Sequence, residues 1–291
     1  MLTRTQFLSA QALHDANRLT YWVGLPCALF HRIATASPDV AAVGGLLLVG
    51  TAATFAAIAA AAVTARLLRL PAGSHGTFIQ GVFRGNLAFI GLPVVLYAFQ
   101  GTASAGAAGS ALLAFGPMVV LYNVLAVVVL LLAGGAGRRG LLRTVGYGLL
   151  SNPILIACAA GLLFSLAGFG LPTLVQRTLA AIGQMALPLA LICIGGTLHA
   201  TRLRGSLGPA MLGSVMKVAL VPAIGLLLAL WADLSAEHTR IVLLLLACPT
   251  ASASYVLVRQ LQGDEALASS MVVISNVLAV PAMAAVLAVT A

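Results

Sequence analysis

Two basic residues stand inside long apolar stretches of the chain. Arg84 and Lys217 each lie well within such a stretch, whereas the other basic residues fall at the ends of the stretches or between them. If the stretches span a membrane, an ionised group at that depth is costly and usually marks the path of a substrate or an ion. The alternative is that both side chains extend toward the membrane surface. Because the buried formal charge is positive, the pattern favours an anionic passenger.

The acidic and histidine side chains fall outside the centres of the apolar stretches. The carboxylates are Asp15, Asp39, Asp233, Glu237, Asp264 and Glu265, and the histidines are His14, His31, His75, His199 and His238. No carboxylate is therefore predicted at a span centre to hold Na⁺ or relay a proton. The cysteines are Cys27, Cys158, Cys193 and Cys248. They lack the clustered spacing of a zinc site, and we expect neither a metal nor a cofactor.

Two of the apolar stretches carry helix-breaking residues flanked by polar ones near their centres. These residues are Arg84, Gly85, Asn86, Gly91 and Pro93 in residues 77–99, and Pro249, Thr250 and Ser252 in residues 239–260. Proline removes a backbone donor, glycine adds conformational freedom, and freed backbone groups at membrane depth need protein or a watery cavity to satisfy them. We therefore predict two half-helices whose N-terminal N–H groups form an anion site. Two ordinary proline kinks are the alternative.

Short echoes relate the two halves of the chain. The string NVLAV occurs at residues 123–127 and 276–280, and LPCAL at 25–29 is echoed by LPLAL at 187–191. In both echoes the second copy lies five predicted spans after the first. Because successive spans cross the membrane in opposite directions, an odd shift pairs spans of opposite direction and gives inverted repeats. Such repeats are a common plan of secondary transporters. The same shift pairs the two interrupted stretches. Asn123 and Asn276 then either line the site beside the breaks or form hydrogen bonds between helices.

The composition predicts the class of protein that holds these residues. The 291-residue chain is 61% apolar and 7% charged, with a mean hydropathy of +1.09. An ordinary soluble domain is about a quarter charged, so this chain cannot cover a water-facing surface. Long continuous apolar runs such as residues 121–133 favour helices over a transmembrane barrel, whose strands alternate in character. We predict an all-α polytopic membrane protein.

Nine helical spans are predicted, each near the roughly 20 residues that a crossing requires. They are residues 17–36, 40–65, 77–99, 107–133, 146–168, 177–199, 208–231, 239–260 and 266–290. Together with the echoes, they predict a first repeat of four spans over residues 1–133 and a second of five spans over residues 146–291. Residues 134–145 form the predicted cytoplasmic linker.

The basic residues predict the orientation. With the N-terminus inside, one side receives Arg4, Arg18, Arg66, Arg69, Arg138, Arg139, Arg143, Arg202, Arg204 and Arg259, and the other receives Arg32, Arg177 and Arg240. Because cytoplasmic loops are enriched in Lys and Arg, we predict a cytoplasmic N-terminus. The formal net charge of +9 then faces anionic lipid and requires no nucleic-acid partner.

Several of these residues, in order along the chain, resemble the signature of the auxin efflux carrier family. They are residues 83–93 (FRGNLAFIGLP), 151–153 (SNP), 186–191 with Gly195 and Gly196, Lys217 with Pro222, and residues 248–250 through Tyr255. The resemblance implies two inverted five-helix repeats, crossed broken fourth and ninth helices, and a substrate site at the crossing. It also implies transport of organic anions, as in the bacterial branch labelled malonate or malate transporters. Relative to that pattern, the chain begins at the second helix.

These observations predict a secondary transporter of a small organic anion, working by alternating access in a bacterial inner membrane. The predicted substrate-binding residues are Arg84, Asn86, Gly91, Pro93, Asn123, Lys217, Pro249, Thr250, Ser252 and Asn276. Two alternatives stay open: a sodium-coupled symporter of the bile-acid-transporter type, and a membrane-embedded enzyme, although no HExxH or GxSxG motif is present. The expected partners are the anion and the lipid bilayer, and a homodimer is an open alternative for the assembly.

Overall fold

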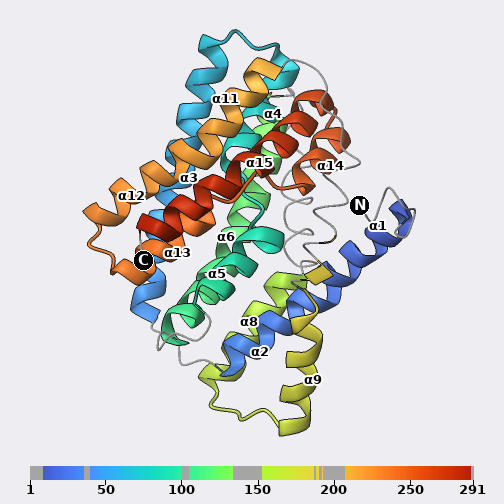
Figure 1. Cartoon of the computed structure of the whole chain (residues 1–291), viewed down its shortest axis with the longest axis vertical. Coiled ribbons are helices and arrows are strands. Elements are labelled where there is room, and N and C mark those ends of the chain that lie inside the picture. Colours follow the sequence, from blue (N-terminus) through green and yellow to red (C-terminus); the bar gives the residue numbers. More distant parts are fainter. Residues whose placement is uncertain are drawn as a thin grey trace.

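The computed structural model describes residues 9–35, 40–99, 105–133, 153–186, 188–189, 192 and 207–289. Within these ranges every regular element is a helix (Figure 1). Four helical stretches there are long and apolar enough to cross a membrane, and they are Val43–Leu67, Leu113–Ala133, Leu207–Trp231 and Glu265–Val289. The chain is therefore an all-α polytopic membrane protein, as its composition predicts.

Some predicted features lie outside the described residues. They are the linker at 134–145, the start of the predicted span 146–168, most of residues 187–206 with Cys193 and His199, and the basic residues Arg4, Arg138, Arg139, Arg143, Arg202 and Arg204. Of the two spans concerned, the structure describes α8 (Pro153–Leu166) and α9 (Thr173–Gln184).

Four predicted spans form long helical stretches close to their predicted limits. They are α3 (Val40–Leu67), α6 (Ala105–Ala133), α15 (Glu265–Val289), and the run formed by α11 (Leu207–Val215), the π-helical turn η4 (Met216–Leu220) and α12 (Val221–Trp231). α6 and α15 contain Pro117 and Pro281 without a break in the assigned helix. A proline alone is therefore a poor predictor of where this chain interrupts a helix.

Wide π-helical turns accompany three other prolines. The turns η1 (Thr20–Gly24), η2 (Leu87–Gly91) and η4 each run directly into a helix whose second residue is proline: α2 (Leu25–Thr35), α5 (Leu92–Ala98) and α12. A proline clashes with the carbonyl group four residues before it. A π turn widens the backbone at that point and relieves the clash. α1 (Ala10–Leu19), η1 and α2 thus form one run that starts earlier than the predicted residue 17.

The two stretches predicted to be interrupted are the ones that break. α4 (Ala72–Phe83) ends before residues 84–86, and η2 and α5 follow. α13 (Ala236–Leu246) ends before residues 247–252, and α14 (Ala253–Gln260) follows. Pro93 lies inside the helical run after the first break. Pro249 lies in the second break, whereas we expected it to start the second half-helix.

Figure 1 shows two groups of helices. α1, α2, α8 and α9 lie together, and α2 packs against both α8 and α9. The larger group contains α3–α6 and α11–α15, and its core includes buried residues of both broken helices, such as Phe83, Leu87 and Leu244. α6 contacts α2 and α8, and so connects the groups.

Candidate functional site

The two breaks are bonded directly to each other. The Asn86 N–H donates to the Pro249 carbonyl at 2.8 Å, and the Ala251 N–H donates to the Arg84 carbonyl at 2.9 Å. Between these bonds, Gly85 and Thr250 form an isolated antiparallel bridge. The predicted crossing of two broken helices is therefore present. Its two segments come from the third and eighth predicted spans, which are related by the same shift as the sequence echoes.

This pairing changes which backbone amides are free to bind a ligand. The amides of Asn86 and Ala251 are used within the crossing, and the Thr250 N–H donates to Ser275 Oγ at 3.0 Å. Buried backbone donors are almost always satisfied, so these three amides stabilise the crossing and are not free for a ligand.

Free amides remain at the starts of the two half-helices that leave the crossing. Within the described part of the chain, the N–H groups of Leu87 and Ala88 at the start of η2 have no acceptor, and neither do those of Ser252 and Ala253 at the start of α14. The first N–H groups of a helix carry partial positive charge. Both half-helices therefore present unused donors at the crossing.

A cavity of about 360 Å³ is lined by three of these four residues, Leu87, Ala88 and Ala253. Its lining is Arg18, Tyr21 and Trp22 from α1 and η1, residues 84–89 from the first break and η2, Val119, Tyr122 and Asn123 from α6, and Ala251 and Ala253 from the second break and α14. Small-molecule sites typically span roughly 300–1,000 Å³. The cavity thus has the volume of a small-ligand site and lies between the two groups of helices.

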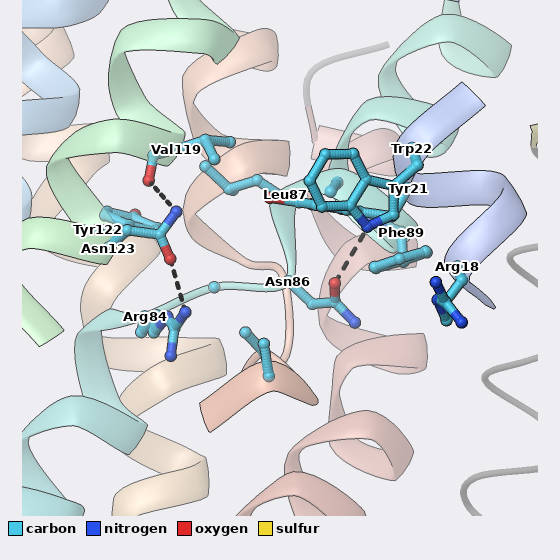
Figure 2. Close-up of a pocket in the computed structure, with 14 residues that line it drawn as sticks. Arg18, Tyr21, Trp22, Arg84, Asn86, Leu87, Phe89, Val119, Tyr122 and Asn123 are labelled. Atoms are coloured by element: carbon cyan, nitrogen blue, oxygen red, sulfur yellow. Dashed lines mark hydrogen bonds between the residues drawn. The ribbon is translucent and has the colours of Figure 1, made fainter. Parts of the chain in front are cut away.

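Arg84 supplies a buried positive charge to this cavity. Its side chain is 7% exposed, and its Nη2 donates to Asn123 Oδ1 at 2.6 Å. Asn123 Nδ2 in turn donates to the Val119 carbonyl at 2.9 Å, which fixes the orientation of the amide (Figure 2). No carboxylate among the described residues pairs with the guanidinium group.

Among the described residues that line the cavity, three buried side-chain groups that can donate a hydrogen bond lack a partner. They are Arg84 Nη1, Asn86 Nδ2 and Tyr122 Oη. The other atom of the Asn86 amide, Oδ1, accepts the Phe89 N–H at 3.4 Å, so Asn86 caps η2 (Figure 2). An unsatisfied buried donor costs about 1–3 kcal/mol. A ligand that offers oxygen acceptors and negative charge would recover that energy.

Six predicted site residues build the crossing or its flanks and do not line this cavity. They are Gly91, Pro93, Lys217, Pro249, Thr250 and Ser252. Thr250 Oγ1 donates to the Gly81 carbonyl at 2.7 Å, and Lys217 Nζ donates to the Leu246 carbonyl at 2.8 Å. A Cβ added to Gly91 would lie 2.7 Å from Cys248 Sγ. Thr250, Lys217, Gly91 and Pro249 thus make contacts that hold the two breaks together.

Asn276 does not take the same role as its repeat counterpart Asn123. Both side chains donate to a carbonyl four residues earlier, and for Asn276 this is Val272 at 2.7 Å. Asn123 lines the cavity, but Asn276 does not. In α15 the neighbouring Ser275 contacts the break instead, through Thr250. Asn123 is therefore the member of the pair that the structure places at the cavity.

The lining also includes residues that sequence reasoning did not select as site residues. Arg18 was interpreted as a topology signal and Phe89 as part of the motif at residues 83–93, whereas Tyr21, Trp22 and Tyr122 were not singled out. Tyr122 directly precedes the repeated segment at residues 123–127, which was the one available signal for it. Tyr21 and Trp22 gave none, since aromatic side chains are also common in lipid-facing and core positions.

Comparison with known proteins adds a family. The sequence model described as membrane transport protein matches residues 137–287. The match covers slightly more than half of the chain and includes Lys217, the second break and Asn276, while Arg84, Asn86 and Asn123 lie before it. No curated protein matches the chain.

Proposed function

The chain belongs to the membrane transport protein family, and we propose that it is a secondary transporter of a small organic anion. One observation carries the proposal. The buried guanidinium group of Arg84 and the amide of Asn86 each leave a donor without a partner at a cavity that also contains free half-helix amides. A carboxylate matches this set, because its two oxygens accept several hydrogen bonds and its charge opposes that of Arg84.

In the proposed complex, the carboxylate accepts from Arg84 Nη1 and Asn86 Nδ2. The amides of Leu87, Ala88 and Ala253 add partial positive charge from the starts of two half-helices. Asn123 holds the other arm of the guanidinium group and so aims Nη1 at the ligand. The role of Asn123 is to orient Arg84, and the roles of Arg84 and Asn86 are to bind the anion.

The place of the cavity supports transport by alternating access. Arg18, Tyr21 and Trp22 line it from the group that contains α1 and α2, whereas the crossing lines it from the larger group. A relative movement of the two groups would expose the same site to one side of the membrane and then to the other. The chain contains no P-loop motif for ATP, so we propose that a gradient or the membrane potential drives transport.

We place the substrate among mono- and dicarboxylates of the size of malonate or malate, and the protein in a bacterial inner membrane with a cytoplasmic N-terminus. The cavity volume suits a molecule of this size, and Arg18 provides a second positive charge on its lining for a second carboxylate.

Uptake by proteoliposomes tests the proposal. Purified protein is reconstituted, and uptake of labelled malonate, malate and indole-3-acetate is measured for the wild type and for Arg84→Gln. Loss of a charge-assisted hydrogen bond costs about 1.5–3 kcal/mol, so we expect roughly 10- to 100-fold weaker apparent affinity. Arg177→Gln, which alters an exposed arginine on α9, is the matched control. Equal uptake by Arg84→Gln and the wild type would refute the proposed site.

A further inference from the structure

Lys217 occupies a different position at the crossing from Arg84. Its side chain is fully buried at 0% exposure, yet it does not line the cavity. Its Nζ donates to the carbonyl of Leu246, the last residue of α13, at 2.8 Å. The ammonium group also lies against the first break, because a Cβ added to Gly85 would be 3.3 Å from Nζ. One positive charge therefore contacts both interrupted segments.

The surroundings of this ammonium group are those of a cation site at a helix end. The last carbonyls of a helix lack intrahelical partners, and this end carries roughly half a negative charge. In transporters with broken helices, such carbonyl ends and the unwound backbone coordinate small cations. No described carboxylate pairs with Lys217. The acceptor of its hydrogen bond is therefore a backbone carbonyl, which is also a usual ligand of a bound cation.

We propose that Lys217 is a tethered cation that permanently fills the cation position at the carboxyl end of α13. It holds the second break against the first, and so acts on the cavity as a positioning residue rather than as a contact of the substrate. A consequence is that the crossing needs no sodium ion at this position. The expectation that transport needs no sodium ion rests on the proposed function. The expectation that Lys217 stabilises the crossing does not.

The close approach of Gly85 fits this assignment. The added Cβ would lie 3.3 Å from both Lys217 Nζ and Cys248 Cβ, which is tight for a methyl group. Glycine at this position lets the ammonium group approach the backbone of the first break while it bonds to the end of α13.

Chemical rescue tests the proposal through stability. Lys217→Ala removes the charge and leaves space, whereas Lys217→Met removes the charge and fills most of the space. We expect methylammonium chloride to raise the Tm of detergent-purified Lys217→Ala by roughly 2–4 °C relative to the same concentration of tetramethylammonium chloride. The wild type and Lys217→Met should show no such difference. An equal response of Lys217→Ala to both salts, or an equal response of Lys217→Met, would overturn the proposal.

Transport provides a second readout, which includes a measurement on the wild type alone. Replacing sodium with N-methylglucamine should leave carboxylate uptake by the wild type unchanged, and a sodium requirement would contradict the proposal even if Lys217→Ala cannot be purified. Lys217→Ala should lose at least about 10-fold in uptake rate and recover with methylammonium, while Lys217→Met should not recover. If the wild type moves no carboxylate, the proposed function fails, and the Tm comparison still decides the role of Lys217.

Discussion

Asn123 shows how one side chain gives the cavity its chemistry. Its Oδ1 accepts from Arg84 Nη2 at 2.6 Å, and its Nδ2 donates to the Val119 carbonyl. The sequence predicted Arg84 from its depth in an apolar stretch, Asn86 from its place at an interrupted stretch, and Asn123 from the repeated segment. It could not predict which amides stay free, since that depends on the bonds between two segments more than 160 residues apart. The Asn86 N–H, for example, donates to the Pro249 carbonyl and is not free for a ligand.

Asn123 and Asn276 form a matched pair for mutation. Asn123→Leu and Asn276→Leu each remove a hydrogen bond to a carbonyl four residues earlier, but only Asn123→Leu removes the acceptor that orients Arg84. We expect Asn123→Leu to raise the KM for carboxylate uptake about 5- to 10-fold, since one lost hydrogen bond costs roughly 1 kcal/mol or more. Asn276→Leu should leave the KM near that of the wild type. Equal effects of the two substitutions would mean that Asn123 has no special link to the site.

At the scale of elements, the two broken helices were predicted correctly, but the details of the breaks were not. Pro249 was expected to start a half-helix, yet α14 begins at Ala253. The reason is that the Pro249 carbonyl and the Ala251 N–H bond to the first break, which keeps these residues out of a helix. Pro93 was expected near a break, but the wide turn of η2 accommodates it within a helical run. Proline and glycine in the sequence indicate which helix is interrupted. The hydrogen bonds to the other interrupted segment determine which residues leave the helix.

The tight packing of the crossing can be measured with a glycine substitution. Gly91→Ala places a Cβ 2.7 Å from Cys248 Sγ, whereas a Cβ at Gly73 meets nothing within 4 Å. We expect Gly91→Ala to lower the free energy of unfolding by about 1–3 kcal/mol through overpacking, and Gly73→Ala to change it little. Adding Cys248→Ala to Gly91→Ala should restore part of the loss, as thermal or denaturant unfolding would show. A Gly91→Ala protein as stable as the Gly73→Ala protein would show that the contact is not tight.

For the whole molecule, composition together with the long continuous apolar runs predicted an all-α polytopic membrane protein. The nine predicted spans are harder to match one by one. In the described ranges four helical stretches are both long and apolar enough to cross a membrane unbroken. The crossing divides two other predicted spans into short pieces, and two more are only partly described. The cavity could not be predicted at this scale, since Arg18 and Trp22 line it from α1 and η1, and no pattern in the sequence places these elements beside the crossing.

The orientation of the molecule in the membrane is open to a direct test. In a background with all four cysteines replaced, single cysteines are placed at Arg69, which follows α3, and at Asp233, which follows α12. We expect a membrane-impermeant maleimide added to intact cells to label the cysteine at 233 and not the one at 69, because the basic residues place the loop at 69 in the cytoplasm. Permeabilised cells should label both. The reverse pattern in intact cells would invert the proposed topology.

The most direct measurement of the central claim is substrate protection at the crossing itself. Ala253 lies at the start of α14 and lines the cavity, so Ala253→Cys in the cysteine-free background reports on its occupancy. We predict that a transported carboxylate slows modification of this cysteine by a small methanethiosulfonate reagent, that the same concentration of chloride does not, and that Arg84→Gln abolishes the protection. Unchanged protection in Arg84→Gln, or no protection by a carboxylate that the wild type carries, would contradict an anion site at the crossed breaks.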